Sequence, residues 1–253
     1  MYIEIQWMKV ISYLSSKLAS ASLLTILFWL ITSGFDLYSW SESLEGPFIL
    51  VFFYGYAIGY SMLVDLLLFK VTQNYRIPIG LLLHFAGGYI PFLFMSSGVF
   101  IFLFAGTIGA ACAFVFYGID YFIRKIGQYS IVVAVLLLGV IITVATVDFT
   151  ITKQWKLERT DTSYEASFSQ FNGKKAIVID AVKDQVITFS VKWFNENGGG
   201  HGMHVLDDKG DYVGMKSLGS NKQSFVAERT GAYSIIITGD ELEGSVSVKW
   251  EIE

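Results

Sequence analysis

The feature that most constrains this chain is a change in composition near residue 150. Residues 1–150 hold six Lys or Arg and seven Asp or Glu, whereas residues 151–253 hold twelve and fifteen. A water-soluble domain carries charge at about a quarter of its positions, so the first part of the chain is too apolar to fold in water. We therefore predict a membrane domain followed by a water-soluble domain.

Five apolar stretches of the first part are each long enough to cross a hydrocarbon core about 30 Å thick. They are Leu18–Leu37, Pro47–Phe69, Ile77–Met95, Val99–Ile123 and Ile131–Phe149. We predict an all-α bundle of about five transmembrane helices over residues 18–149, preceded by a cytoplasmic or interfacial segment of residues 1–17. A tight turn is expected between the third and fourth helices, at Ser96, Ser97 and Gly98.

The distribution of basic residues predicts the orientation of the bundle in the membrane. All six fall in alternate polar gaps: Lys9, Lys17, Lys70, Arg76, Arg124 and Lys125. Because cytoplasmic loops carry an excess of Lys and Arg, we expect the N-terminus in the cytoplasm and the C-terminal domain outside the plasma membrane. Three basic residues directly after the last span argue for the opposite orientation: Lys153, Lys156 and Arg159.

Three ionisable residues lie inside the predicted spans, in the half that we expect to face the cytoplasm: Asp65, His84 and Asp120. Such residues are costly in a membrane and often mark a transport path, so together they could relay a proton or bind a cation. Structural roles are the alternative. Asp120 can pair with Arg124 one helical turn later, and His84 can donate to a backbone carbonyl.

Small residues four positions apart occur in two spans: Gly55 with Gly59, and Gly106 with Ala110. Such pairs let helix backbones approach closely, so we expect these residues to pack helices together. The pair Gly55 and Gly59 also offers a surface through which two copies of the chain could associate. The pattern is common in multi-span proteins and does not specify a function.

The last part of the chain follows the period of two that is typical of strands with one buried face. Residues 187–193 and 246–252 alternate apolar and polar side chains. Two of the turn signals between such runs are Asn172-Gly173 and Gly239-Asp240. We predict an antiparallel, jelly-roll-like sandwich of short strands over residues 163–253, joined to the bundle by a linker of residues 150–162.

The end of this domain resembles a known class of module. The residues that carry the resemblance are Phe225–Glu228, Thr230-Gly231-Ala232-Tyr233, Ser234–Thr238 and Gly244–Trp250. They are similar to the closing strands of the extracytoplasmic GOLD-like or pre-peptidase C-terminal-like β-sandwich modules of bacterial surface proteins. The resemblance implies a non-catalytic binding or spacer domain. The membrane part resembles small, functionally uncharacterised multi-pass membrane proteins of Gram-positive bacteria.

One glycine-rich segment of the predicted sandwich contains His201, Met203 and His204. Imidazole and thioether groups are ligands for copper or zinc, but residues three apart on a strand point to opposite faces, which argues against a metal site. We expect no cofactor. We expect contact with a partner to depend on exposed aromatic or charged side chains of this domain, and we select Trp193 and Tyr212 as candidates.

The sequence contains no G-x-S-x-G, H-E-x-x-H, P-loop or dinucleotide-binding motif. Its net charge of −4 argues against binding of nucleic acid. We therefore expect a non-enzymatic protein of the lipid bilayer whose exported sandwich binds a protein, a ligand or an envelope component, as a sensor, accessory subunit or immunity-type protein. The alternative is a small transporter or ion-conducting subunit that uses Asp65, His84 and Asp120. A membrane enzyme that uses the same groups ranks last.

Overall fold

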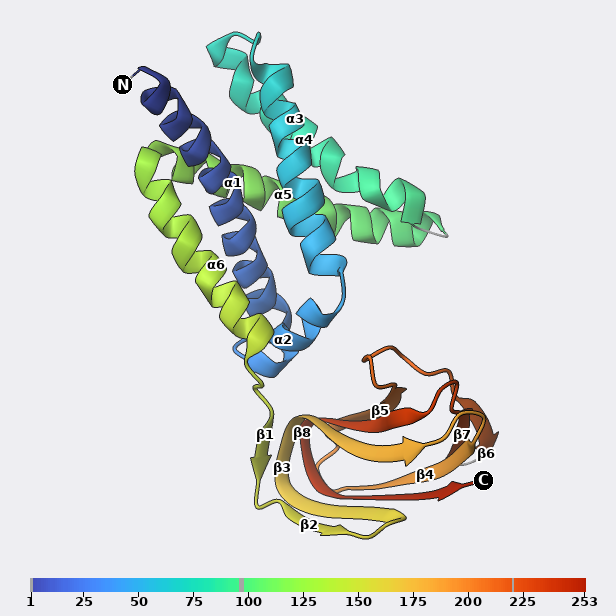
Figure 1. The fold of residues 1–253 in the computed structure, drawn as a ribbon. Helices are drawn as coiled ribbons and strands as arrows, with labels where there is room; N and C mark the ends of the chain where they lie inside the picture. The colour runs from blue at the N-terminus through green and yellow to red at the C-terminus, as the bar shows by residue number, and fades with distance from the viewer. Residues whose placement is uncertain (1, 96–97, 220) are drawn as a thin grey trace. The chain divides into compact units, whose positions relative to one another are not determined.

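The computed structural model describes residues 2–95, 98–219 and 221–253, and the chain divides into two compact units after residue 147 (Figure 1). The first unit is helical and the second is built from antiparallel strands. The predicted fold class, a helical membrane bundle followed by an antiparallel β domain, is confirmed. The turn predicted at residues 96–97 lies outside the described residues.

Over the described residues, six α-helices form the first unit together with a π-helical segment and a short 3-10 helix. In chain order they are α1 (Tyr2–Ser33), α2 (Leu37–Glu45), η1 (Leu50–Tyr56), α3 (Ala57–Leu68), α4 (Gln73–Met95), α5 (Val99–Lys125), η2 (Gly127–Tyr129) and α6 (Ser130–Thr146). Five stretches of the described chain are long and apolar enough to cross a bilayer. They are Gln6–Ser33, Leu50–Leu68, Gln73–Met95, Val99–Lys125 and Gly127–Thr146.

The largest departure from the predicted spans is at the N-terminus. We predict a separate segment over residues 1–17, but α1 runs without a break from Tyr2 to Ser33. No proline or glycine interrupts this run, and the helix ends where Gly34 adopts a positive φ of 58°. Lys17, which we assign to a loop, therefore lies inside the first membrane-spanning helix.

A short helix that we did not predict, α2, occupies the first polar gap. Asp36 caps its N-terminus by accepting a hydrogen bond from the Tyr38 N–H at 3.1 Å. Trp40 of α2 stacks on Trp29 of α1 with ring centroids 5.1 Å apart, and the Trp29 indole donates to the Ser43 hydroxyl at 2.7 Å. The gap is therefore folded against the end of α1.

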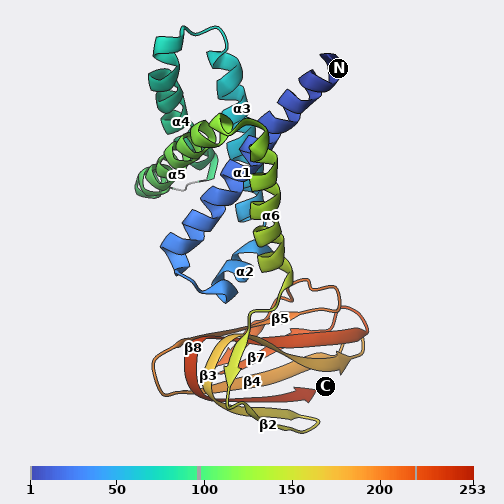
Figure 2. The same ribbon diagram turned by 90° about the vertical axis from the view of Figure 1, so that its left-hand side faces the viewer.

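Small residues of α1 let other helices of the first unit pack closely against it. Ala19 clusters with Ile123 of α5 and Ala134 of α6, and α1 contacts α6, beside which it lies in Figure 1 and which it crosses in Figure 2. Ala21 of α1 joins a second buried cluster that contains Phe116 of α5. These contacts bring the polar face of α1 toward its neighbouring helices.

Helices α4 and α5 pack closely because glycines lie between them. A Cβ atom added to Gly88 of α4 would lie 2.3 Å from the backbone of Ala110 on α5. One added to Gly106 would lie 2.2 Å from the Tyr89 ring. The small residues of α5 therefore lie in this intramolecular interface.

The other pair of small residues does not pack within the chain. A Cβ added to Gly59 would have no described atom within 4 Å, and one on Gly55 would meet the carbonyl oxygen of Leu50 at 3.7 Å. Over the described residues, this face of η1 and α3 is open. Association with a second copy through Gly55 and Gly59 stays a prediction.

The described part of the second unit has eight strands in one antiparallel sheet, which folds back on itself as two layers (Figures 1 and 2). The strands are β1 (Ile151–Lys153), β2 (Lys156–Arg159), β3 (Ser163–Ala181), β4 (Val186–Asn195), β5 (Gly200–Leu206), β6 (Lys216–Gly219), β7 (Lys222–Val226) and β8 (Gly231–Ile252). The hydrogen-bonded order is β1-β3-β8-β4-β7-β6, with β2 also on β3 and β5 also on β8. One apolar core, which includes Phe171, Ile187 and Ile235, fills the interior.

The long strands β3 and β8, which are bent in Figure 1, continue through the positions where we predicted turns, Asn172-Gly173 and Gly239-Asp240. Gly173 has a φ of 140°, and the register between the strands shifts beside it. A Cβ on Gly239 would lie 2.5 Å from the ring of Phe171, which is fully buried. The two turn predictions are wrong because glycine permits a bend within a strand as readily as a turn between strands.

The predicted linker of residues 150–162 is largely part of the sheet. Strands β1 and β2 both pair with β3, and Trp155 between them stacks on Phe168 with ring centroids 5.0 Å apart. These strands are short and lie at an edge, where most side chains are exposed. Their alternation is therefore too weak to be recognised in the sequence.

Candidate functional site

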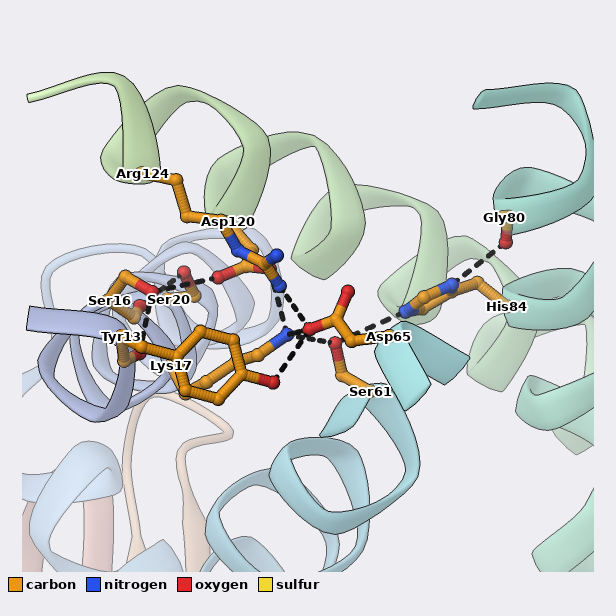
Figure 3. Close-up of polar contacts among 10 residues, drawn as sticks. All are labelled: Tyr13, Ser16, Lys17, Ser20, Ser61, Asp65, Gly80, His84, Asp120 and Arg124. Atoms are coloured by element: carbon orange, nitrogen blue, oxygen red, sulfur yellow. Dashed lines mark hydrogen bonds and ion pairs between the residues drawn. The ribbon is translucent and has the colours of Figure 1, made fainter. Parts of the chain in front are cut away.

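Four charged side chains from three helices meet inside the helical unit (Figure 3). The Lys17 ammonium of α1 lies 2.8 Å from Oδ2 of Asp65 on α3 and 2.9 Å from Oδ2 of Asp120 on α5. The guanidinium of Arg124, one turn further along α5, contacts the same two oxygens. Two positive groups face two negative groups, so this ion cluster is neutral as a whole.

Lys17 has a side chain that is 0% exposed. An unpaired ammonium is costly in such an environment, and here the ammonium contacts Asp65, Asp120 and the Ser61 hydroxyl, 2.6 Å away. An ammonium has three N–H donors, so these three contacts can use all of them. The side chains of Asp65 and Arg124 are 25% and 35% exposed, whereas that of Asp120 is 3% exposed. The cluster is therefore closed at Asp120 and accessible at Asp65 and Arg124.

Neutral side chains of α1 also contact the two carboxylates. The Tyr13 hydroxyl donates to Asp65 at 2.8 Å, and the Ser16 hydroxyl lies 3.3 Å from the second oxygen of Asp120. Residues three and four positions apart share a face of a helix, so Tyr13, Ser16 and Lys17 all face α3 and α5. This polar stripe is the sequence signal that places Lys17 within a helix interface.

His84 of α4 is connected to the ion cluster through Ser61. Its buried imidazole has Nδ1 2.8 Å from the carbonyl oxygen of Gly80, so we assign the hydrogen to Nδ1. Nε2 is then an acceptor, and it lies 3.4 Å from the Ser61 hydroxyl. Because Ser61 also contacts Lys17, a chain of polar contacts extends from Asp65 to His84 (Figure 3).

The structure thus brings together the three intramembrane residues that we selected from the sequence. Both structural alternatives are also present, since Asp120 pairs with Arg124 and His84 contacts a backbone carbonyl. Sequence reasoning missed Lys17, which we count among the loop residues. Its partners Asp65 and Asp120 lie on other helices, far away in the sequence.

Two clefts border the ion cluster, and Tyr13 lines both of them. The first has a volume of about 470 Å³ and is lined by apolar side chains of α3 together with Asp65. The second has a volume of about 390 Å³ and is lined by Lys9, Arg124 and Gln128, among others. The partly exposed members of the cluster each border one of these clefts.

In the β unit, the three candidate metal ligands do not converge. His201 and Met203 lie on one face of β5, where Met203 packs against the core and the His201 ring is 4.9 Å from that of Trp193. His204 lies on the opposite face, 5.1 Å from the ring of Tyr212. Among the described residues, no group of three or more His, Cys, Asp or Glu could hold a metal ion.

The two candidate partner-binding residues have different surroundings. Trp193 is half-buried against the core, whereas Tyr212 is 74% exposed. His204, on which Tyr212 packs, pairs across the sheet with the buried Ile236 of β8. Tyr212 therefore lies beside His204 on the outer face of the sheet, in the cross-strand row that contains Ile236. Sequence reasoning did not select Phe194, which is also exposed.

The turn before Tyr212 is organised by Asp207. One carboxylate oxygen of Asp207 accepts hydrogen bonds from the N–H groups of Asp211 and Lys209, both at 2.9 Å, and the other lies 3.1 Å from Arg229. The Asp211 N–H, then the Lys209 N–H and the Arg229 charge, hold the pKa of the Asp207 carboxyl below its usual range. These contacts fix the backbone that presents Tyr212.

Comparison with known proteins does not assign the chain to a family. No family model matches it, and no curated protein matches it. Among solved structures, PliG of Aeromonas hydrophila, a periplasmic inhibitor of g-type lysozyme, is similar to part of the chain, with 14% identity and a TM-score of 0.27. The match covers 35% of this chain and 84% of that chain. This likeness is too distant to support an argument about function.

Proposed function

We propose that this chain is a non-enzymatic, multi-pass membrane protein whose β unit binds a protein or envelope partner outside the cytoplasm, with Tyr212 in the contact. The five apolar helical stretches and the separate core of the β unit support the membrane part of the proposal. The contact rests on one observation: a largely exposed aromatic ring directly follows a hydrogen-bonded turn and packs on His204 at the outer face of the sheet. Tyrosine on a rigid element is enriched at protein interfaces.

In this proposal the ion cluster has a structural role. Its four charged groups come from α1, α3 and α5, and each contacts a group of opposite charge. Charged side chains inside a membrane bundle are costly unless they pair with groups of opposite charge. A neutral cluster thus holds three helices in one arrangement.

Site-specific crosslinking in cells tests the partner contact. A photoreactive amino acid at Tyr212 is expected to produce a discrete adduct of higher mass that contains this chain. The matched control is the same amino acid at Lys192, an exposed position on β4 in the other layer of the β unit. Absence of an adduct at Tyr212, or equal adducts at both positions, would contradict the proposed contact.

Cysteine labelling tests on which side of the membrane the β unit lies. Cys112 is the sole cysteine of the chain, so Cys112→Ala provides a background without thiols. Lys209→Cys then places a thiol in the exposed turn of the β unit. Labelling of intact cells by an impermeant maleimide is the expected result. Labelling only after lysis would place the β unit in the cytoplasm and overturn the proposal.

Transport of a proton or cation is a second candidate function, and one observation favours it. Polar contacts connect the partly exposed Asp65 with the buried His84. This function requires that Asp65→Asn and His84→Ala abolish flux in proteoliposomes while leaving the protein folded. Wild-type flux equal to that of empty liposomes would reject it.

A further inference from the structure

We propose that the second cleft binds the phosphate of an anionic phospholipid. The residues that line this cleft include Met8, Lys9, Ser12, Tyr13, Arg124 and Gln128. It lies where the N-terminal part of α1 meets the junction of α5 and α6, and its volume is about 390 Å³. The proposal goes beyond the proposed function because it concerns the helical unit and does not depend on the partner of the β unit.

Two cationic side chains border the cleft, Lys9 from α1 and Arg124 from α5. Both carboxylates of the ion cluster contact the same nitrogen of Arg124, Nη2. A guanidinium carries five N–H donors, so Nη1 and Nε can donate to a ligand in the cleft. Among the described residues, no carboxylate lies within ion-pair distance of Lys9. Both side chains are therefore suited to bind a phosphate.

The charge of the site favours an anion. The positive charges of Lys17 and Arg124 are balanced by Asp65 and Asp120 within the ion cluster. Lys9, which also lines the cleft, adds one positive charge. A ligand with one negative charge, such as a phosphodiester, would neutralise this excess without breaking the cluster.

The surroundings of the cleft indicate a lipid and not a free phosphate. Met8 provides an apolar wall, and the neighbouring Trp7 and Tyr129 are exposed, as aromatic residues are at membrane interfaces. The Lys125 ammonium, at the end of α5, lies 4.2 Å from the centroid of the Tyr121 ring. Basic pockets between helices at this level bind anionic headgroups.

The test uses the full-length protein in a neutral detergent, with bound lipid counted by native mass spectrometry. The probe is dihexanoyl phosphatidylglycerol, and the comparison ligands are dihexanoyl phosphatidylcholine and glycerol 3-phosphate. We expect one phosphatidylglycerol to bind in preference to both. Equal binding of phosphatidylcholine would show that the negative charge is not recognised. Equal binding of glycerol 3-phosphate would assign the cleft to a soluble phosphate ester.

Substitutions locate the binding site. Lys9→Gln is expected to weaken phosphatidylglycerol binding about fivefold, the effect of one basic residue near a headgroup. Lys125→Gln is the matched control. It also removes one positive charge, at the end of α5 next to Arg124, but Lys125 does not line the cleft. Unchanged binding in Lys9→Gln, or equal weakening in both variants, would overturn the proposal. Arg124 is left intact because the ion cluster depends on it.

Discussion

Replacing Lys17 by methionine tests whether the ion cluster holds the helices together. Methionine keeps most of the apolar stem of lysine and removes the ammonium. Asp65 and Asp120 are then left with Arg124 as the sole cation of the cluster. One negative charge thus loses its compensation in a site where the Asp120 side chain is 3% exposed.

The expected loss of stability is large for a single substitution. Removing one partner of a buried ion pair costs about 3–5 kcal/mol, and we expect Lys17→Met to lower the free energy of unfolding by that amount. Adding Asp120→Asn restores a neutral site, in which Asp65 still pairs with Arg124. We expect the double variant to recover about 2 kcal/mol, within the range of coupling between contacting residues.

The measurement is equilibrium unfolding in mixed micelles of increasing SDS content, followed by tryptophan fluorescence. Trp29 and Trp40 are stacked and buried in the helical unit, so their emission should change when α1 and α2 separate. The control is Lys125→Met, an exposed lysine on α5. Its unfolding free energy is expected to stay within about 0.5 kcal/mol of the wild type.

Two outcomes would refute this reasoning. If Lys17→Met is as stable as Lys125→Met, the buried ammonium contributes nothing to the packing of α1. If adding Asp120→Asn to Lys17→Met lowers stability further, the loss does not arise from an uncompensated carboxylate.

Three further predictions concern close packing and the turn at Asp207. Gly88→Ala places a Cβ 2.3 Å from the backbone of Ala110, and we expect it to lower the free energy of unfolding in the same SDS titration by about 1–3 kcal/mol. The control is Gly59→Ala, because a Cβ at Gly59 meets no described atom within 4 Å. Equal losses of stability in the two variants would contradict the packing argument. Gly239→Ala places a Cβ 2.5 Å from the Phe171 ring and should lower the melting temperature of the β-sheet circular dichroism signal, whereas Gly214→Ala should not. The pKa of Asp207 is lowered in the folded protein, so its contribution is present above the unfolded value of about 3.9 and is lost as pH falls through the lower folded value. Protection of the Asp211 amide from hydrogen exchange, corrected for the intrinsic rate, should therefore decrease below about pH 4. In Asp207→Asn the protection of this amide should not vary with pH. An identical pH profile in both proteins would show that the Asp207 carboxylate does not hold the turn.

The local patterns that predicted the fold class are properties of single segments. Five apolar stretches are long enough to span a membrane, and this property depends on their own residues and not on the helices they pack against. The alternation over residues 187–193 likewise persists as strand β4. Helix α2 was missed because its nine residues are too few to stand out in the polar gap between two long apolar spans, and its stacking on α1 is a tertiary contact.

The bends of β3 and β8 illustrate a signal that has two structural meanings. The same glycine pattern can end a strand or let it bend, and the choice depends on whether the chain on both sides finds partners. Gly173 and Gly239 lie around the buried Phe171, and pairing continues beyond both. That outcome follows from the pairing and packing of β3 on β8, which no local sequence pattern contains.

The ion cluster separates the two kinds of information most clearly. The sequence by itself determined that Asp65, His84 and Asp120 lie within apolar helices, because hydrophobicity is a sum over adjacent residues. It did not determine that Lys17, 103 positions from Asp120, completes the cluster. Only the tertiary structure decides this, because the free energy of a buried charge depends on which opposite charges the packed helices bring within contact distance.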